Sequence, residues 1–132
     1  MKRVVCLFCT LMLCCLTAGC AISKTFEVTG TDSIVIMSGT TEESVEVTDP
    51  ETVRELTENI NSIEFTRRQS SKNSSGWSYS LRWYGPDGEE IESVTVQGNG
   101  TIDYDGHFWS AVSGSIDMDL FDDLLSGQYG NQ

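Results

Sequence analysis

The stretch WSYSLRWYGPDG, residues 77–88, decides the fold predicted for this chain. Large apolar side chains occupy alternate positions in its first half, with small or charged residues between them. Because the side chains of a strand alternate between its two faces, this period of two predicts a strand with one buried face. The GPDG that follows favours a turn, since proline fixes φ and glycine accepts positive φ. The residues expected on the buried face are Trp77, Tyr79, Leu81 and Trp83.

An earlier strand is predicted where Ile63 and Phe65 alternate with polar residues. If Phe65 lies opposite Leu81 in an antiparallel pair, apolar side chains meet on the inner face. The same register places Glu64 opposite Arg82 on the outer face. Apolar pairing and charge pairing then agree, which favours this register over a slip by one residue.

Two further strands are predicted after the turn. Val94 and Val96 alternate with polar residues, and GNG at 98–100 favours a second turn, which leads into Ile102 and Tyr104. With Val96 placed opposite Ile102, the four strands form a C-terminal antiparallel meander.

Three strands and a helix are predicted before the meander. The strand-like segments are TFEVTG (25–30), SIVIMS (33–38) and SVEVT (44–48). SIVIMS is apolar on both faces, which is typical of a central strand. The helix is DPETVRELTENI (49–60), with Asp49 as its N-cap and a proline at its first position.

A second helix is predicted from IDMDLFDDLLSG (116–127), with Asp117 or Ser115 as its N-cap and a glycine at its end. The sequence therefore predicts an α+β fold, in which an antiparallel sheet of about six or seven strands carries two helices on one face. We expect a single domain over 25–127 and a flexible tail over 128–132.

The first twenty residues contain all five cysteines and have the pattern of a secretory signal. A basic head precedes the apolar run 4–16, which is shorter than the roughly 20 residues that cross a bilayer. Small residues then lead to Cys20, which resembles the lipobox of bacterial lipoproteins, where this cysteine is acylated. We predict a signal peptide at 1–19 and a lipid anchor with a short tether at 20–24. The alternatives are an ordinary cleaved signal peptide or a helical anchor.

The chain is strongly acidic, with 20 Asp and Glu against 8 Lys and Arg and a net charge of −12. Removing 1–19 takes away two basic residues and changes the net charge to −14. This charge argues against nucleic acid as a partner. Half of the six basic residues that remain lie in one short segment: Arg67, Arg68 and Lys72.

These three residues are candidates for binding a partner. One interpretation is a solvated hairpin tip whose charges balance nearby acids. The other is a surface that binds phospholipid headgroups, wall teichoic acid or an acidic protein. Trp109 and His107 are further candidates, because a partly exposed Trp109 would stack on a sugar or on a partner, although burial is the commoner fate of tryptophan.

The sequence gives little support to catalysis or to a bound metal. His107 is the sole histidine, and Asp105 and Ser110 lie near it in sequence, but nearness in sequence is not the geometry of a triad. Zinc requires several Cys or His ligands, and the acids at 103–106 match only part of a calcium loop. We predict no catalytic residue, no metal site and no cofactor, and keep a hydrolase or inhibitor acting around His107 as the alternative function.

The segments SSKNSSGWSYSLRWYGPDGEEI (70–91) and DGHFWSAVSGSIDMDLFDDLL (105–125) resemble parts of small lipoproteins from Gram-positive bacteria of the clostridial group. That family is classed as a domain of unknown function, so the resemblance implies a secreted domain and assigns no activity and no functional residue. We therefore expect an extracytoplasmic protein, held at the bacterial membrane through Cys20. We expect a non-enzymatic binding or interaction module of the cell envelope, whose partner is an anionic envelope polymer or a protein.

Overall fold

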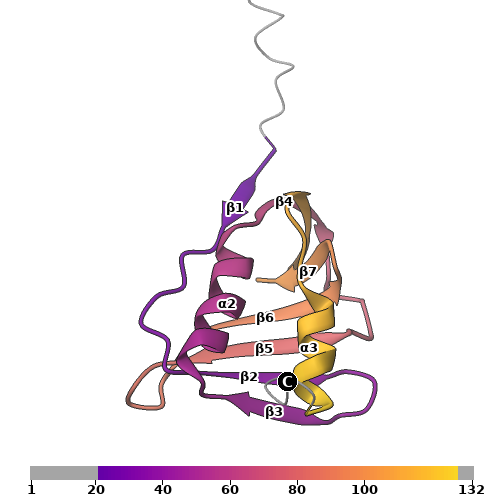
Figure 1. Ribbon diagram of the computed structural model, residues 1–132. Coiled ribbons are helices and arrows are strands. Elements are labelled where there is room, and N and C mark those ends of the chain that lie inside the picture. The colour runs from indigo at the N-terminus through magenta and orange to yellow at the C-terminus, as the bar shows by residue number, and fades with distance from the viewer. Residues whose placement is uncertain (1–20, 128–132) are drawn as a thin grey trace, which may run out of the picture.

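The computed structural model describes residues 21–127, and the predictions for 1–20 and 128–132, Cys20 included, lie outside these residues. Eight strands form one antiparallel sheet and two helices accompany it, which confirms the α+β class with a larger sheet than expected. The strands are β1 Ser23–Thr25, β2 Ser33–Ser38, β3 Ser44–Val47, β4 Glu64–Ser70, β5 Tyr79–Tyr84, β6 Glu90–Gly98, β7 Thr101–Tyr104 and β8 His107–Ser113. The helices are α2 Pro50–Asn61 and α3 Met118–Leu125. Both helices lie in front of the sheet in Figure 1, on one face, and α3 contacts β2 and β3.

The strands follow the order β1-β4-β8-β7-β6-β5-β2-β3 across the sheet. The last four strands, β5 to β8, form a C-terminal meander, and the predicted pair of Val96 with Ile102 is confirmed. The membership of the meander differs from the prediction. Its fourth strand is β8, which was not predicted, whereas β4 pairs with β8 and β1 outside the meander.

The predicted pairing of the strand at Phe65 with the strand at Leu81 is therefore wrong. Phe65 lies opposite Ala111 of β8. Leu81 lies between Ile36 of β2 and Val94 of β6. The physical reason is that several strands carry the same apolar alternation, and the connection between β4 and β5 is long enough for the chain to cross to the far side of the meander.

Two side chains of the stretch 77–88 also lie elsewhere than predicted. Arg82 approaches Glu90, with Nε and Oε1 4.0 Å apart, and does not pair with Glu64. Trp77 is 37% exposed, because β5 begins only at Tyr79 and the alternation does not extend back to it.

The segment predicted as a strand at 25–30 belongs to the sheet only at its first residue, since β1 ends at Thr25. Phe26 and Val28 are nevertheless buried. The side chain of Asn61, at the end of α2, replaces a neighbouring strand. Its Oδ1 accepts from Val28 N–H at 3.0 Å and its Nδ2 donates to Val28 O at 3.0 Å. These bonds satisfy the backbone N–H and C=O of Val28, which lies outside the strands of the sheet.

Both helices begin after a predicted N-cap, and α2 ends at Asn61, one residue beyond the predicted range. Asp49 caps α2, since its Oδ2 accepts from Thr52 N–H at 3.0 Å and from the Thr52 hydroxyl at 2.8 Å. These bonds favour the ionised carboxyl and lower the pKa of Asp49. Asp117 caps α3 through Leu120 N–H at 3.2 Å, and Gly127, with φ of 73°, follows the end of α3.

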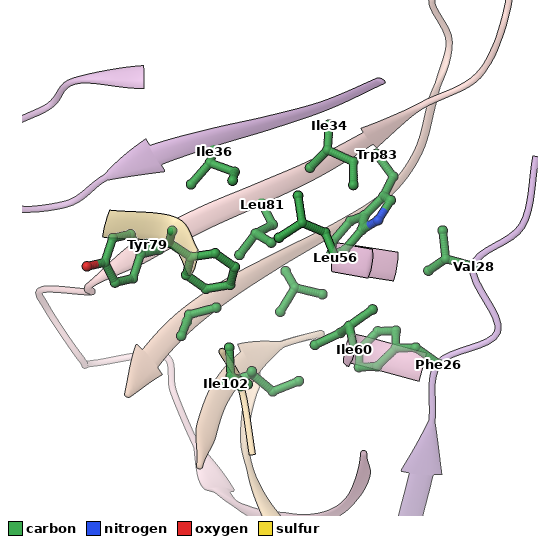
Figure 2. Close-up of a cluster of buried hydrophobic side chains, with 14 of the residues drawn as sticks. Phe26, Val28, Ile34, Ile36, Leu56, Ile60, Tyr79, Leu81, Trp83 and Ile102 are labelled. Atoms are coloured by element: carbon green, nitrogen blue, oxygen red, sulfur yellow. The ribbon is translucent and has the colours of Figure 1, made fainter. Parts of the chain in front are cut away.

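The core lies between the helices and the inner face of the sheet. In Figure 2 the side chains of Ile34, Leu56, Leu81 and Trp83 gather in one cluster. Trp83 has no exposed surface, and its Nε1–H donates to Thr57 Oγ1 of α2 at 3.2 Å. This bond satisfies the one polar atom of the indole while the ring fills the centre of the core.

We predict that Trp83→Ala lowers the free energy of unfolding by about 3–5 kcal/mol, because it removes a fully buried indole and leaves a cavity. Trp77→Ala, at an exposed tryptophan six residues earlier, is the matched control and should cost much less. Denaturant unfolding followed by far-UV circular dichroism measures both. Equal losses for the two variants would contradict the placement of Trp83 at the centre of the core.

We expect the free energy of unfolding to fall at high pH, where the phenol of Tyr79 ionises. The Tyr79 hydroxyl donates to Asp122 Oδ1 of α3. Burial, and then the hydrogen bond and charge of Asp122, raise the pKa of Tyr79 from 10.0 to about 12. A phenol whose pKa rises on folding stabilises the fold fully below pH 10 and loses that contribution as the pH rises through 12.

We predict that Tyr79→Phe costs about 1–2 kcal/mol at neutral pH and removes this part of the alkaline loss of stability. Tyr84→Phe, at a half-buried tyrosine of the same strand, is the control and should retain the alkaline loss. Urea midpoints measured from neutral pH to pH 12 decide between these outcomes. An unchanged alkaline loss in Tyr79→Phe would contradict the assignment.

Candidate functional site

The register of the first strand places the basic residues beside the start of the domain. Ser23 lies opposite Thr66, and Arg67 N–H donates to the carbonyl oxygen of Ile22 at 2.8 Å. Lys24, opposite Phe65, belongs to the same pair of strands. We call Lys24, Arg67, Arg68 and Lys72 the basic edge, and it holds four of the six basic residues of 21–127.

The basic edge differs from the rest of the protein in its ion pairs. Arg54 pairs with Glu58 at 3.3 Å, and Arg82 approaches Glu90 at 4.0 Å. Arg67, Arg68 and Lys72 are exposed, and within the described residues none of them forms an ion pair. The charges that the sequence singled out are therefore available to a partner.

Lys24 is held in place by two rings. Its Nζ lies 4.8 Å from the ring centroid of Phe26 and 4.8 Å from that of Tyr104. The rings also contact one another edge to face, with centroids 5.0 Å apart. A cation between two ring faces is stabilised by their quadrupoles, so the ammonium of Lys24 is fixed beside the first strand. Lys24 was not among the predicted candidates, since a single lysine forms no pattern in the sequence.

Lys72, the last residue of the basic edge, follows a serine that is bonded to Asp103. Ser71, next to Lys72, donates its hydroxyl to Asp103 Oδ1 at 2.6 Å and its N–H to the Gly106 carbonyl at 3.0 Å. These bonds hold the connection after β4 against β7 and against the turn between β7 and β8. Arg67 and Arg68 precede this connection and lie on β4 itself.

Trp109 does not belong to an exposed binding surface. It is 7% exposed, and its Nε1–H donates to the Tyr104 carbonyl at 3.0 Å. Its ring is part of the core, which removes the option that it stacks on a sugar or on a partner.

His107 is half-buried, and its Nδ1 lies 3.2 Å from the carbonyl oxygen of Asp105. His107 and Ser110 are three residues apart on β8, so they point to opposite faces of the sheet. Asp105 meets His107 through its backbone. The three side chains that a triad would need are therefore not brought together.

A hollow of about 390 Å³ lies between the segment 28–32 and helix α2. Its lining includes Thr31, whose Oγ1 is buried without a hydrogen-bond partner within the described residues, and Arg54, which pairs with Glu58. This hollow was not predicted, because TGTD at 29–32 carries no signal beyond that of a turn.

Among residues 21–127, no group of three or more His, Cys, Asp or Glu is placed to hold a metal ion. Neither α2 nor α3 is long and apolar enough to cross a membrane.

Comparison with protein-family models, with curated proteins and with solved structures finds no match to this chain.

Proposed function

We propose that this protein is a lipid-anchored, extracytoplasmic module of the bacterial cell envelope that binds an anionic partner and carries no enzymatic activity. The single observation that carries the proposal is the basic edge. Of the six basic residues of 21–127, three lie on the paired strands β1 and β4 and a fourth, Lys72, follows β4 directly, in a domain with a large excess of acids. Arg67, Arg68 and Lys72 are exposed without ion pairs among the described residues. A solvated surface of an acidic protein does not require its cations to cluster in this way.

The proposed location rests on the sequence that precedes the domain. A basic head, a short apolar run and small residues before Cys20 support cleavage and acylation at that cysteine. Residues 21–132 contain no cysteine, so the domain depends on its packed core and needs no disulfide outside the cytoplasm.

The alternative function, a hydrolase or inhibitor around His107, has less support. Its serine would have to come from the opposite face of the sheet, and the candidate acid contacts the imidazole through a backbone carbonyl. The binding module requires no rearrangement of the described residues.

We predict that Cys20→Ala releases the domain from membranes or leaves an unprocessed precursor, because acylation at this thiol supplies the anchor. Fractionation of cells that express the full chain, with mass determination of the product, measures both outcomes. Cys15→Ala, in the segment to be removed, is the control and should leave a mature, membrane-bound protein. A Cys20→Ala protein that is matured and retained as before would contradict the anchor.

A further inference from the structure

We propose that the basic edge binds the anionic headgroups of the same bilayer that holds Cys20, so that the anchored domain stands with β1 and β4 toward the membrane. This inference rests on the proposed anchor and adds to it a partner and an orientation. The other surface that such an edge would fit, a soluble anionic polymer, is an outcome of the test below.

The first step is the reach of the chain. Ile22 is fixed by its backbone to Arg67, at 2.8 Å, and two residue steps separate Ile22 from Cys20. An extended chain covers about 3.5 Å per residue, so an acylated Cys20 lies within about 7 Å of Ile22 along the chain. A lipid at Cys20 therefore brings Arg67 and Arg68 to the depth of the headgroups, with no further segment between.

The second step is the separation of charge along the sheet. The residues 21–27 and 64–72 hold four basic and two acidic side chains, a net charge of +2. The residues 28–63 and 73–127 hold two basic and eighteen acidic side chains, a net charge of −16. An anionic surface therefore attracts the end that carries β1 and repels the rest of the domain.

The acidic helix α3 lies at the far end of the sheet from β1. It contacts β2 and β3, which end the strand order opposite β1 (Figure 1). Neighbouring strands are about 4.8 Å apart, so the two ends are separated by on the order of 30 Å. This is several Debye lengths at physiological salt, so acids near α3 do not cancel the attraction at the basic edge.

The third step is the chemistry of the groups. Arg67 and Arg68 are exposed, and a guanidinium donates two parallel N–H groups to the oxygens of a phosphate. Ile22, 46% exposed, is bonded through its carbonyl to Arg67 and offers an apolar side chain to the interface. The anchor keeps lipid phosphates at high local concentration around these arginines, which favours headgroups over a partner that must diffuse to the site.

The test uses the mature, acylated chain in vesicles of phosphatidylcholine, with and without an equal part of phosphatidylglycerol. The chain beyond Cys20 has no cysteine, so one introduced cysteine carries one fluorescent label. Gln69→Cys reports on β4 beside the basic edge, and Thr41→Cys reports on the turn between β2 and β3. Quenching by a lipid-borne quencher measures how close each label lies to the bilayer.

On the anionic vesicles we expect the label at residue 69 to be quenched more than the label at residue 41, and on neutral vesicles this excess should shrink. Each arginine near an anionic surface contributes about fivefold, so Arg67→Gln with Arg68→Gln should reduce the preference for this orientation roughly 25-fold. The matched pair Arg54→Gln with Arg82→Gln removes the same charge from other elements and should preserve the excess. Unchanged unfolding transitions establish that each variant is folded.

Equal quenching of both labels on anionic vesicles, or an excess that survives the Arg67 and Arg68 changes, would overturn the inference. It would also be overturned if poly(glycerol phosphate) bound the arginines while anionic lipid left the labels unchanged. A failure of the anchor itself is distinguishable, because the protein would then not float with neutral vesicles at all.

Discussion

The indole of Trp83 connects the two layers of this protein. It lies opposite Ile34 of β2, has no exposed surface, and donates its N–H to Thr57 of α2. Apolar and polar side chains alternate along the strands around Trp83. Together with this contact, the alternation leaves the sheet with one buried face, which the two short helices cover. Because strand side chains alternate, the residues between the buried ones face water, and the helices hold their acids on the outside. The positions of the charged side chains on the surface therefore follow from which face of the sheet packs into the core.

Because β4 pairs with both β1 and β8, the basic residues of β4 lie at the β1 end of the sheet. This pairing places the segment that begins the domain against the strand that carries Arg67 and Arg68. The first strand is three residues long, yet it determines which end of an eight-stranded sheet lies next to the tether. The basic segment does not form the tip of a hairpin. It lies along the edge of the sheet, beside the chain that leads to Cys20. The proposed binding surface, anchor and orientation therefore all depend on the pairing of β1 with β4.

Much of the fold was predictable from local signals. The alternation at Leu81 and Trp83, the cap at Asp49 and the turn between Val96 and Ile102 each depend on residues close in sequence, and each is present. Strand partners depend on contacts distant in sequence, and the alternation at Phe65 fits β5 as well as β8. The strand β8 was missed because HFWSAVS places apolar residues side by side and follows no clean period of two.

The candidate site was predictable in part, for the same reason. The cluster of Arg67, Arg68 and Lys72 was visible in the sequence, but its position beside β1 was not, since it follows from the pairing with Ser23–Thr25. Trp109 was a candidate because a partly exposed tryptophan would stack on a sugar or on a partner. The structure buries it through the unpredicted strand β8.

The amide hydrogen exchange of Arg67 tests most directly the claim that the start of the domain is paired with β4, the strand that carries Arg67 and Arg68. Its N–H donates to Ile22, whereas the Ala111 N–H donates to Gly100 and is independent of β1. The account predicts slow exchange at both amides in the mature protein. In a chain that begins at Phe26 it predicts fast exchange at Arg67 and slow exchange at Ala111. Exchange at Arg67 that is equally fast in the two chains would contradict it.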